Sequence, residues 1–250
     1  MTIDHAAPSV INEQFARQGW VHVPSLGVDA AELSRARGVL DQLFDRFVDV
    51  PKQFAHDLAG GADPAKPILP EINAVSTLAP ELRKTAVFHA AHQLAKQLLG
   101  QNAYVLYDHA IYKPPGLAGT TSWHQDSGYD PDHTNRLAIW IPFQDTSVED
   151  GAMRYVTRSH LGGRQTHLER TTADGKTVKY LEVDEATVAE APCELGGATA
   201  HDFHTVHGAG PNLGVNTRKA WILDFTTGSV AERAIEAAKE KVRVRRYRVL

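Results

Sequence analysis

The chain has 250 residues, 42% of them hydrophobic, and a formal net charge of −4 at pH 7. This length suffices for one buried core with added helices, so we expect a single domain over residues 1–250. The small negative charge argues against a protein that binds nucleic acid by neutralising phosphates. The single cysteine, Cys193, excludes an internal disulfide and a cluster of metal-bound thiolates.

The sequence also indicates a cell compartment and a class of partner. A single cysteine fits a reducing environment. The sequence has no stretch with the length and hydropathy of a transmembrane helix, and its first residues lack the basic start and apolar block of a signal peptide. We therefore expect a soluble cytoplasmic protein that acts on a small molecule, without nucleic-acid or membrane partners. The sequence leaves the oligomeric state open.

Residues 1–100 predict a largely helical N-terminal part. Apolar residues have helical spacing over 10–18, and residues 19–24 have the pattern of a short strand. An amphipathic helix is expected over 29–48, where Asp29 is a suitable N-cap and one stripe is apolar: Leu33, Ala36, Leu40, Leu43 and Phe47. Residues 51–74 are irregular and rich in Pro, Gly and Asp, which is typical of a lid. A further helix is expected over 80–99.

Residues 101–228 predict a β-rich barrel, followed by a C-terminal extension over 229–250. The apolar run 137–143 is expected to form a buried strand. The polar stretch 162–179 predicts either a loop that closes over substrate or a surface hairpin that turns at Asp174-Gly175. Alternating basic residues over 239–248 predict an edge strand with a solvated face.

His124 and Asp126 form the first half of a candidate metal site. In a strand, residues two apart point to the same face, so a His-x-Asp pair offers an imidazole and a carboxylate to one ion. Such a pair also arises by chance, and by itself it favours an exposed polar loop. Here it lies between a Gly/Pro-rich segment, residues 113–119, and the expected strand 137–143. This setting is typical of the mouth of a jelly-roll barrel.

Three histidines compete for the place of the third ligand: His201, His204 and His207. If residues 200–207 form one strand, His204 faces away from the other two. His207 is preferred because it ends that expected strand. Two histidines and a carboxylate leave positions for a cosubstrate and dioxygen, the arrangement of non-heme Fe(II) oxygenases. The remaining two are expected on the surface or as residues that orient a metal ligand.

Arg218 is the candidate anion-binding residue. It begins the apolar run 219–225, which we expect to form a strand beside the one that carries His207. A guanidinium can bind a carboxylate through two parallel N–H donors, so Arg218 would hold the far carboxylate of a cosubstrate. Lys219 would point the other way. Without the metal site, Arg218 would be an ordinary solvated charge.

Further motifs surround these residues in a fixed order. They are Asp108-His109-x-x-x-Lys113-Pro114-Pro115-Gly116, Trp123-His124-Gln125-Asp126-x-x-Tyr129, Trp140, Glu149-Asp150-Gly151-Ala152-Met153, Ser159-His160, His207-Gly208-Ala209-Gly210-Pro211-Asn212 and Arg218. Residues 100–228 thereby resemble the phytanoyl-CoA dioxygenase family. The resemblance implies a mainly β fold with flanking helices, a double-stranded β-helix of the jelly-roll, cupin-like type.

The resemblance also implies site residues. His124, Asp126 and His207 would bind Fe(II), and Arg218 would bind the distal carboxylate of the cosubstrate 2-oxoglutarate, with dioxygen as the second cosubstrate. Halogenating relatives replace the metal-binding carboxylate with a small residue, so Asp126 disfavours halogenation.

Three further residues are assigned to the cosubstrate pocket by the same resemblance. A residue on the strand before Lys113 would contact 2-oxoglutarate near the metal, with His109 as first choice and Tyr107 as second. Trp140 resembles a tryptophan that lines this pocket, although a core aromatic explains it equally well.

The implied activity is that of an Fe(II)- and 2-oxoglutarate-dependent oxygenase acting on a small molecule. C–H hydroxylation in bacterial specialised metabolism is the expected reaction. The same oxidising iron could instead give desaturation, epimerisation or cyclisation. Two alternatives from other classes remain: a cupin-like hydrolase or isomerase with a redox-inert metal, and a metal-free binding protein. The hydrolase or isomerase has no need for an arginine placed to hold 2-oxoglutarate, and the intact set of three candidate ligands argues against the binding protein.

Overall fold

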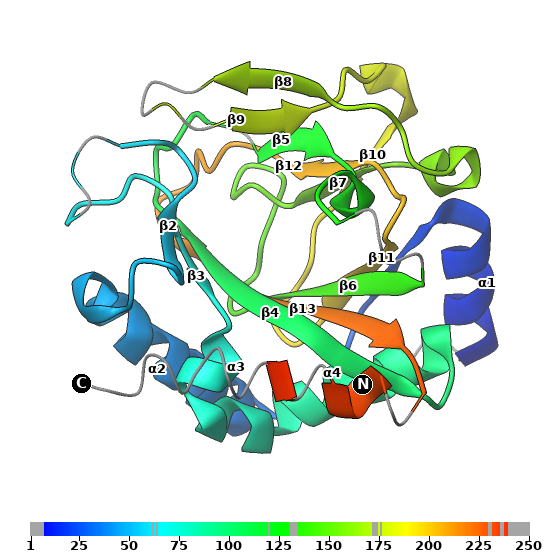
Figure 1. Ribbon diagram of the computed structural model, residues 1–250, viewed down its shortest axis with the longest axis horizontal. Coiled ribbons are helices and arrows are strands. Elements are labelled where there is room, and N and C mark those ends of the chain that lie inside the picture. The colour runs from blue at the N-terminus through cyan, green and yellow to red at the C-terminus, as the bar shows by residue number, and fades with distance from the viewer. Residues whose placement is uncertain are drawn as a thin grey trace.

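The computed structural model describes residues 8–61, 63, 65–119, 121–130, 135–171, 175, 177–229, 232–235 and 238–239. Two antiparallel sheets face each other, and helices cover the outer side of the larger one (Figure 1). This mainly β architecture with flanking helices confirms the double-stranded β-helix expected from the sequence.

The larger sheet has the strand order β1-β11-β6-β13-β4-β3-β2 in the described part of the chain. Its strands are β1 (Trp20–Val23), β2 (Ala55–Asp57), β3 (Pro70–Asn73), β4 (Ala103–Lys113), β6 (Arg136–Pro142), β11 (Ala198–Asp202) and β13 (Arg218–Thr227). The smaller sheet, β10-β7-β12-β5, is built from β5 (Thr121–His124), β7 (Met153–Val156), β10 (Val188–Ala191) and β12 (His207–Ala209).

The remaining elements lie outside the two sheets. The hairpin β8 (Leu168–Thr171) and β9 (Thr177–Tyr180) lies on the far side of the smaller sheet in Figure 1. The helices are α1 (Pro8–Gln18), α2 (Ala30–Asp45), α3 (Val75–Leu78) and α4 (Ala86–Leu99). Short 3-10 helices are η1 (Phe47–Asp49), η2 (Pro80–Lys84), η3 (Asp126–Gly128), η4 (Ser159–Gly162) and η5 (Glu185–Thr187). None of the described helices combines the length and hydropathy required to cross a bilayer.

The central strand β13 shows why one face of the larger sheet carries the chemistry. Side chains alternate between the two faces of a strand. Trp221, Leu223 and Phe225 pack against the helices, whereas Ala220 and Ile222 face the smaller sheet. The helix-covered face is therefore the main hydrophobic core, and the opposite face lines the interior of the barrel.

The helices follow the predicted positions with two changes, the first being that the helix expected over 29–48 ends at Asp45 and is followed by η1. Asp29 caps α2, and its carboxylate accepts a hydrogen bond from the amide of Glu32 at 2.9 Å. The single helix expected over 80–99 is instead divided into η2 and α4. The division occurs because the hydroxyl of Thr85 caps α4 by accepting a hydrogen bond from the amide of Phe88.

The segment 51–74, expected to be an irregular lid, contains β2 and β3 and extends the edge of the larger sheet. That expectation is wrong for these strands, because three and four residues are too few to show an alternating pattern. The loop between them is organised by Asp57, whose carboxylate accepts hydrogen bonds from four backbone amides. The N-terminal part thus supplies three strands beside its helices.

The expected single strand over 200–207 is also wrong. β11 ends at Asp202 in the larger sheet, and His207 begins β12 in the smaller one. The intervening turn is held by the amide of His204, which donates to Asp202 Oδ1, and by the hydroxyl of Thr205, which donates to Gly19 O. The chain therefore crosses between the sheets at this point.

Two further expectations concern the neighbours of β13 and the C-terminal strand. β13 pairs with β4 and β6, so the prediction that it lies beside the strand of His207 is wrong. Most of the C-terminal edge strand expected over 239–248 falls outside the described residues.

Candidate functional site

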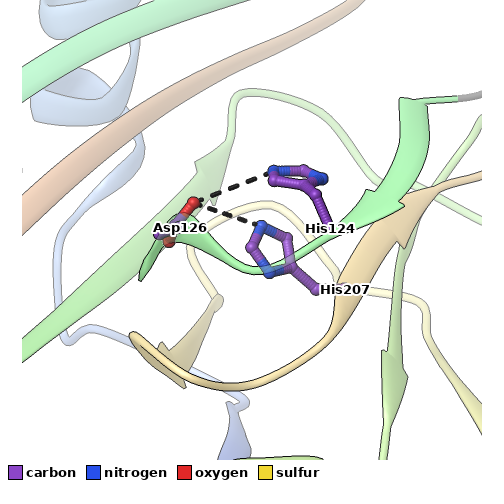
Figure 2. Close-up of side chains that lie close together, drawn as sticks. All are labelled: His124, Asp126 and His207. Atoms are coloured by element: carbon purple, nitrogen blue, oxygen red, sulfur yellow. Dashed lines mark ion pairs between the residues drawn. The ribbon is translucent and has the colours of Figure 1, made fainter. Parts of the chain in front are cut away.

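Three side chains on and beside the smaller sheet converge at the mouth of the barrel. His124 ends β5, Asp126 begins η3 and His207 begins β12. β5 and β12 are neighbours, and His124 is the register partner of His207. One potential ligand atom from each residue lies within 4.8 Å of the others, and Figure 2 shows both imidazoles turned toward the carboxylate. The structure thus brings together the three residues that the sequence proposed as metal ligands.

The outer nitrogen of each imidazole is held by the backbone. His124 Nδ1 donates to Ser122 O at 2.8 Å, and His207 Nδ1 donates to Thr205 O at 2.9 Å. These bonds leave the lone pair of each Nε2 directed inward, 3.8 and 3.7 Å from Asp126 Oδ1. A histidine that binds a metal commonly uses its other nitrogen in this way. The donor set therefore fits a divalent metal ion.

The protonation states also suit a metal. Burial lowers the pKa of His124, and burial together with the neighbouring imidazoles lowers the pKa of His207 well below its usual range. Burial would raise the pKa of Asp126, but the surrounding imidazoles of His207, His201 and His124 hold it far below its ordinary value. Neutral imidazoles and an ionised carboxylate are the forms that coordinate metals.

A fourth buried side chain, His201, comes from the larger sheet. Its Nε2 lies 3.3 Å from Asp126 Oδ2, without an aligned hydrogen-bond partner among the described groups. Its Nδ1 lies 3.4 Å from the hydroxyl of Tyr155. The two oxygens of Asp126 are thus divided, since Oδ1 faces the two ligand imidazoles and Oδ2 faces His201. His204 lies apart from this group, against Phe203.

Two residues to which the sequence assigned no role in positioning the ligands fix the backbone between them. Gln125 is fully buried, and its side chain donates to the carbonyls of Gly163 and His204 and accepts from the amide of Gln165. Its own amide donates to His167 Nε2 at 3.0 Å. The position of Gln125 between two candidate ligands is the sequence feature that indicates its role. The sequence around His167 does not indicate its contact with Gln125.

Two buried cations lie at the other end of the barrel interior. Arg218 on β13 and Lys113 on β4 are register partners. The guanidinium of Arg218 donates to Gly151 O at 2.8 Å, and Lys113 Nζ donates to Gly210 O at 2.5 Å. Burial lowers the pKa of Lys113 to about 7, with a contribution from Arg218, and lowers the pKa of Arg218 to about 10.

This pair of cations lacks a carboxylate partner among the residues that the structure describes. Two adjacent buried charges of the same sign are costly unless an anion binds between them. The sequence alone gives one indication that Lys113 belongs to the site. Lys113 lies four residues after His109 in the same strand, so both side chains point to the same face of the sheet.

The other expected pocket residues also face the barrel interior. Trp140 is buried in the interior cluster, and its ring centroid lies 5.6 Å from the guanidinium carbon of Arg218, so it is both a core aromatic and a wall of the cation site. His109 Nδ1 donates to Glu71 Oε1 at 2.6 Å. The hydroxyl of Tyr107 donates to Asn73 Oδ1. The contacts of His109 and Tyr107 with a cosubstrate stay predictions.

Comparison with known proteins places this site in a family. The model of the family "Phytanoyl-CoA dioxygenase (PhyH)" matches residues 15–220. The structure of EvdO2 from Micromonospora carbonacea var. aurantiaca, complexed with 2-oxoglutarate, has 30% sequence identity and a TM-score of 0.73, and the match covers 91% of this chain and 92% of that one. The carbocyclase SnoK from nogalamycin biosynthesis shares the fold, with 24% identity, a TM-score of 0.68 and coverage of 87% and 83%.

Curated relatives match a shorter part of the chain. A probable alpha-ketoglutarate-dependent hypophosphite dioxygenase of Stutzerimonas stutzeri is 29% identical over 141 residues, which are 53% of this chain and 48% of that protein. The chain spans about half the length of most curated relatives that it matches. The family match nevertheless covers most of the chain, including every residue of the candidate metal centre. The chain belongs to the phytanoyl-CoA dioxygenase family of Fe(II)- and 2-oxoglutarate-dependent oxygenases.

Proposed function

We propose that this protein is an oxygenase that uses Fe(II), 2-oxoglutarate and dioxygen to oxidise a C–H bond of a small molecule. The observation that carries the proposal is the combination of two sites in one barrel. A cluster of two neutral imidazoles and one carboxylate lies at its mouth, and a pair of uncompensated cations lies inside it. A bound metal ion accounts for the cluster of imidazoles and carboxylate, and a bound anion accounts for the pair of buried cations.

Each residue has a distinct part in this proposal. His124, Asp126 and His207 hold Fe(II), which leaves coordination positions for other ligands. Arg218 holds the distal carboxylate of 2-oxoglutarate through parallel N–H donors. Lys113 adds a second positive charge beside that carboxylate.

Three more residues shape the cosubstrate pocket. Trp140 forms the wall beside Arg218 and excludes water from the ion pair. His109, our first choice for a contact near the metal, is held by Glu71, and Tyr107 is the second choice. When bound, the iron together with 2-oxoglutarate and dioxygen supplies the oxidising power for C–H cleavage, while the chain orients the reactants and excludes stray reductants.

Hydroxylation is the proposed outcome, in bacterial specialised metabolism. The support is that EvdO2 comes from Micromonospora carbonacea and that SnoK comes from nogalamycin biosynthesis. Desaturation, epimerisation or cyclisation would use the same site. A hydrolase or isomerase with a redox-inert metal is less favoured, because such an enzyme gives Lys113 and Arg218 no anion to bind.

The test is an anaerobic titration of metal-free protein with Fe(II) and 2-oxoglutarate, followed by the visible charge-transfer absorption of the chelate. We expect the band in the wild type and its loss in His124→Ala. Arg218→Ala should retain iron but bind 2-oxoglutarate at least tenfold more weakly, since it leaves a carboxylate without its charged partner. A wild-type protein that binds Fe(II) but shows no band would contradict the oxygenase. Unchanged 2-oxoglutarate affinity in Arg218→Ala would remove the role of that residue.

A further inference from the structure

The two ends of β4 carry side chains of different charge on the interior face of the barrel. This face holds every second residue of the strand: Tyr107, His109, Ile111 and Lys113. Lys113 and Arg218 form the cationic end. At the opposite end, beyond the apolar Ile111, Tyr107 and His109 meet side chains of the neighbouring strand β3. The interior is therefore cationic at one end, and at the other end it carries a phenol and an imidazole that pair with polar side chains of β3.

We call the group Glu71, Asn73, Tyr107 and His109 the polar wall. Its members form two pairs across β3 and β4: His109 with Glu71 at 2.6 Å, and Tyr107 with Asn73. The rings of Tyr107 and His109 stack with centroids 5.3 Å apart. The side chains of Glu71 and His109 remain 12% and 18% exposed. The wall is thus ordered by its own contacts and still accessible to a ligand.

Acidic groups predominate beside the polar wall. Asp224 on β13 is the register partner of Tyr107. Arg136 lies 3.2 Å from Asp224 and 2.7 Å from Asp130, so its single charge is shared by two carboxylates. Glu71 adds a third carboxylate, opposite His109. An incoming anion would therefore meet negative charge here, and the cations that could attract it lie at the far end.

The polar wall lies within electrostatic reach of the metal centre. Burial opposes protonation of His109, but Glu71 raises its pKa, and Asp224 and Asp126 contribute to the same shift. Burial raises the pKa of Asp224 to about 6, and the charge of Asp126 acts in the same direction. Tyr107, Asp224, Ala138 and His201 are successive register partners across the larger sheet, and His201 Nε2 lies 3.3 Å from Asp126 Oδ2, so the wall and the candidate metal centre lie at the same level of the barrel.

We propose that Glu71 and Asn73 of the polar wall, each held by its partner on β4, bind the hydroxyl groups of an uncharged, polyhydroxylated substrate and present a neighbouring C–H bond to the metal. This inference rests on the proposed function. Glu71 uses Oε1 for His109 and Asn73 uses Oδ1 for Tyr107, so Glu71 Oε2 can accept a hydrogen bond from a substrate hydroxyl and the NH2 group of Asn73 can donate one. An acyl chain would cover these two groups without satisfying them, which costs binding energy for each unpaired group.

The experiment uses the whole protein loaded anaerobically with Fe(II) and 2-oxoglutarate, with nitric oxide added as a spectroscopic substitute for dioxygen. Its electron paramagnetic resonance signal responds to molecules that settle beside the iron. The probes are methyl β-D-glucopyranoside and myo-inositol as polyols, hypophosphite as an oxyanion and butyryl-CoA as an acyl thioester. We expect a polyol, and neither of the others, to change the signal.

Two substitutions connect the response to the wall. Glu71→Gln is nearly isosteric and removes the charge, and Asn73→Leu removes both amide functions. Each should raise the dissociation constant of the polyol about tenfold, the effect of losing one hydrogen bond to a buried group. Glu190→Gln makes the same chemical change as Glu71→Gln on an exposed position of β10, and should bind the polyol like the wild type.

The outcomes separate this inference from the proposed function. A missing charge-transfer band before any probe is added counts against the oxygenase itself. With the band present, a signal that responds to hypophosphite or butyryl-CoA but to neither polyol overturns the inference. A signal that responds to none of the four probes also overturns it, as does equal polyol affinity in wild type, Glu71→Gln and Asn73→Leu.

Discussion

His201 is not one of the three candidate metal ligands, but it lies next to one of them, Asp126, and so affects how that carboxylate is oriented. It faces Asp126 Oδ2, while Oδ1 faces the two ligand imidazoles. Because Oδ2 faces the His201 imidazole, the carboxylate is placed to bind a metal through Oδ1 alone, which would keep the remaining coordination positions open. His201 is therefore a positioning residue, and such contacts typically contribute ten- to a hundredfold to metal affinity.

We expect His201→Leu to weaken Mn(II) binding at least about tenfold, measured anaerobically by the signal of free Mn(II). His201→Gln places an amide near the former Nε2 and should recover much of the affinity. His204→Leu is the matched control, because that ring lies against Phe203 rather than at the metal centre. Equal losses in the glutamine and leucine variants would show that His201 acts only by filling space.

Lys113 predicts a pH dependence of cosubstrate binding. Its pKa is lowered to about 7, mainly by burial and further by Arg218. The dianion of 2-oxoglutarate favours the charged lysine, so affinity should fall as pH rises through 7 toward 9. The sign is opposite for folding: the unfolded chain, with an ordinary lysine pKa, binds more protons in this range, so the Lys113 contribution to stability rises with pH.

The measurement is the 2-oxoglutarate dissociation constant from pH 6.5 to 9, with Mn(II) in place of Fe(II). Lys113→Met should bind weakly throughout, with a flatter profile. Lys219→Met is the control, since Lys219 lies on the opposite face and pairs with Asp41. A wild-type affinity that is constant across this range would contradict a titrating Lys113.

At the scale of elements, the β8–β9 hairpin is tethered to the segment that carries the metal ligands. His167 accepts a hydrogen bond from the amide of Gln125 and lies over Gly128, where an added Cβ would come within 2.3 Å of its ring. Lys179, on the second strand, donates to Gly128 O. Of the two sequence interpretations of 162–179, the antiparallel pairing of β8 with β9 supports the hairpin, the turn expected at Asp174-Gly175 lies partly outside the described residues, and closure over substrate stays a prediction.

Removing the tether should loosen the hairpin without unfolding the barrel. We expect His167→Ala to increase amide hydrogen exchange over 163–171 and 177–181 severalfold or more, because a local opening loses one of the bonds that oppose it. Gly128→Ala should produce the same change by displacing the ring. Glu169→Ala, at an exposed position of β8, should not. Unchanged protection in both test variants would mean that other contacts hold the hairpin.

At the scale of the whole molecule, the metal and the cosubstrate together would connect the two sheets. The candidate ligands come from the smaller sheet, and Arg218 and Lys113 from the larger. A ligand present at a hundred times its dissociation constant stabilises the folded state by about 2.7 kcal/mol. For a chain of this size that corresponds to a rise in Tm of roughly 5–10 °C.

We therefore expect Mn(II) alone to raise Tm, and 2-oxoglutarate to add a further rise only when Mn(II) is present. Arg218→Leu should keep the first increment and lose the second. Removing the metal with EDTA should abolish both. A full 2-oxoglutarate increment in Arg218→Leu would mean that the cosubstrate does not bridge the sheets through this residue.

The sequence was most informative where local pattern and local geometry coincide. Asp29 capped α2 as expected, and the apolar stripe of that helix is buried at Leu33, Ala36 and Leu40. The grouping of His124 with Asp126 followed from the two-residue period of a strand and its motif context. His207 was chosen from a wrong premise, a continuous strand, and lies beside them because β12 pairs with β5.

By itself, then, the sequence determined the family, the jelly-roll class and the three candidate metal ligands, because these depend on short motifs and on their order along the chain. Only the tertiary structure decided what surrounds them. The contact of His201 with Asp126, the pairing of Lys113 with Arg218 and the joining of β3 to β4 each depend on which strands become neighbours. Strand pairing is set by non-local packing between distant segments, and hydrophobic periodicity within one segment carries no information about its partner.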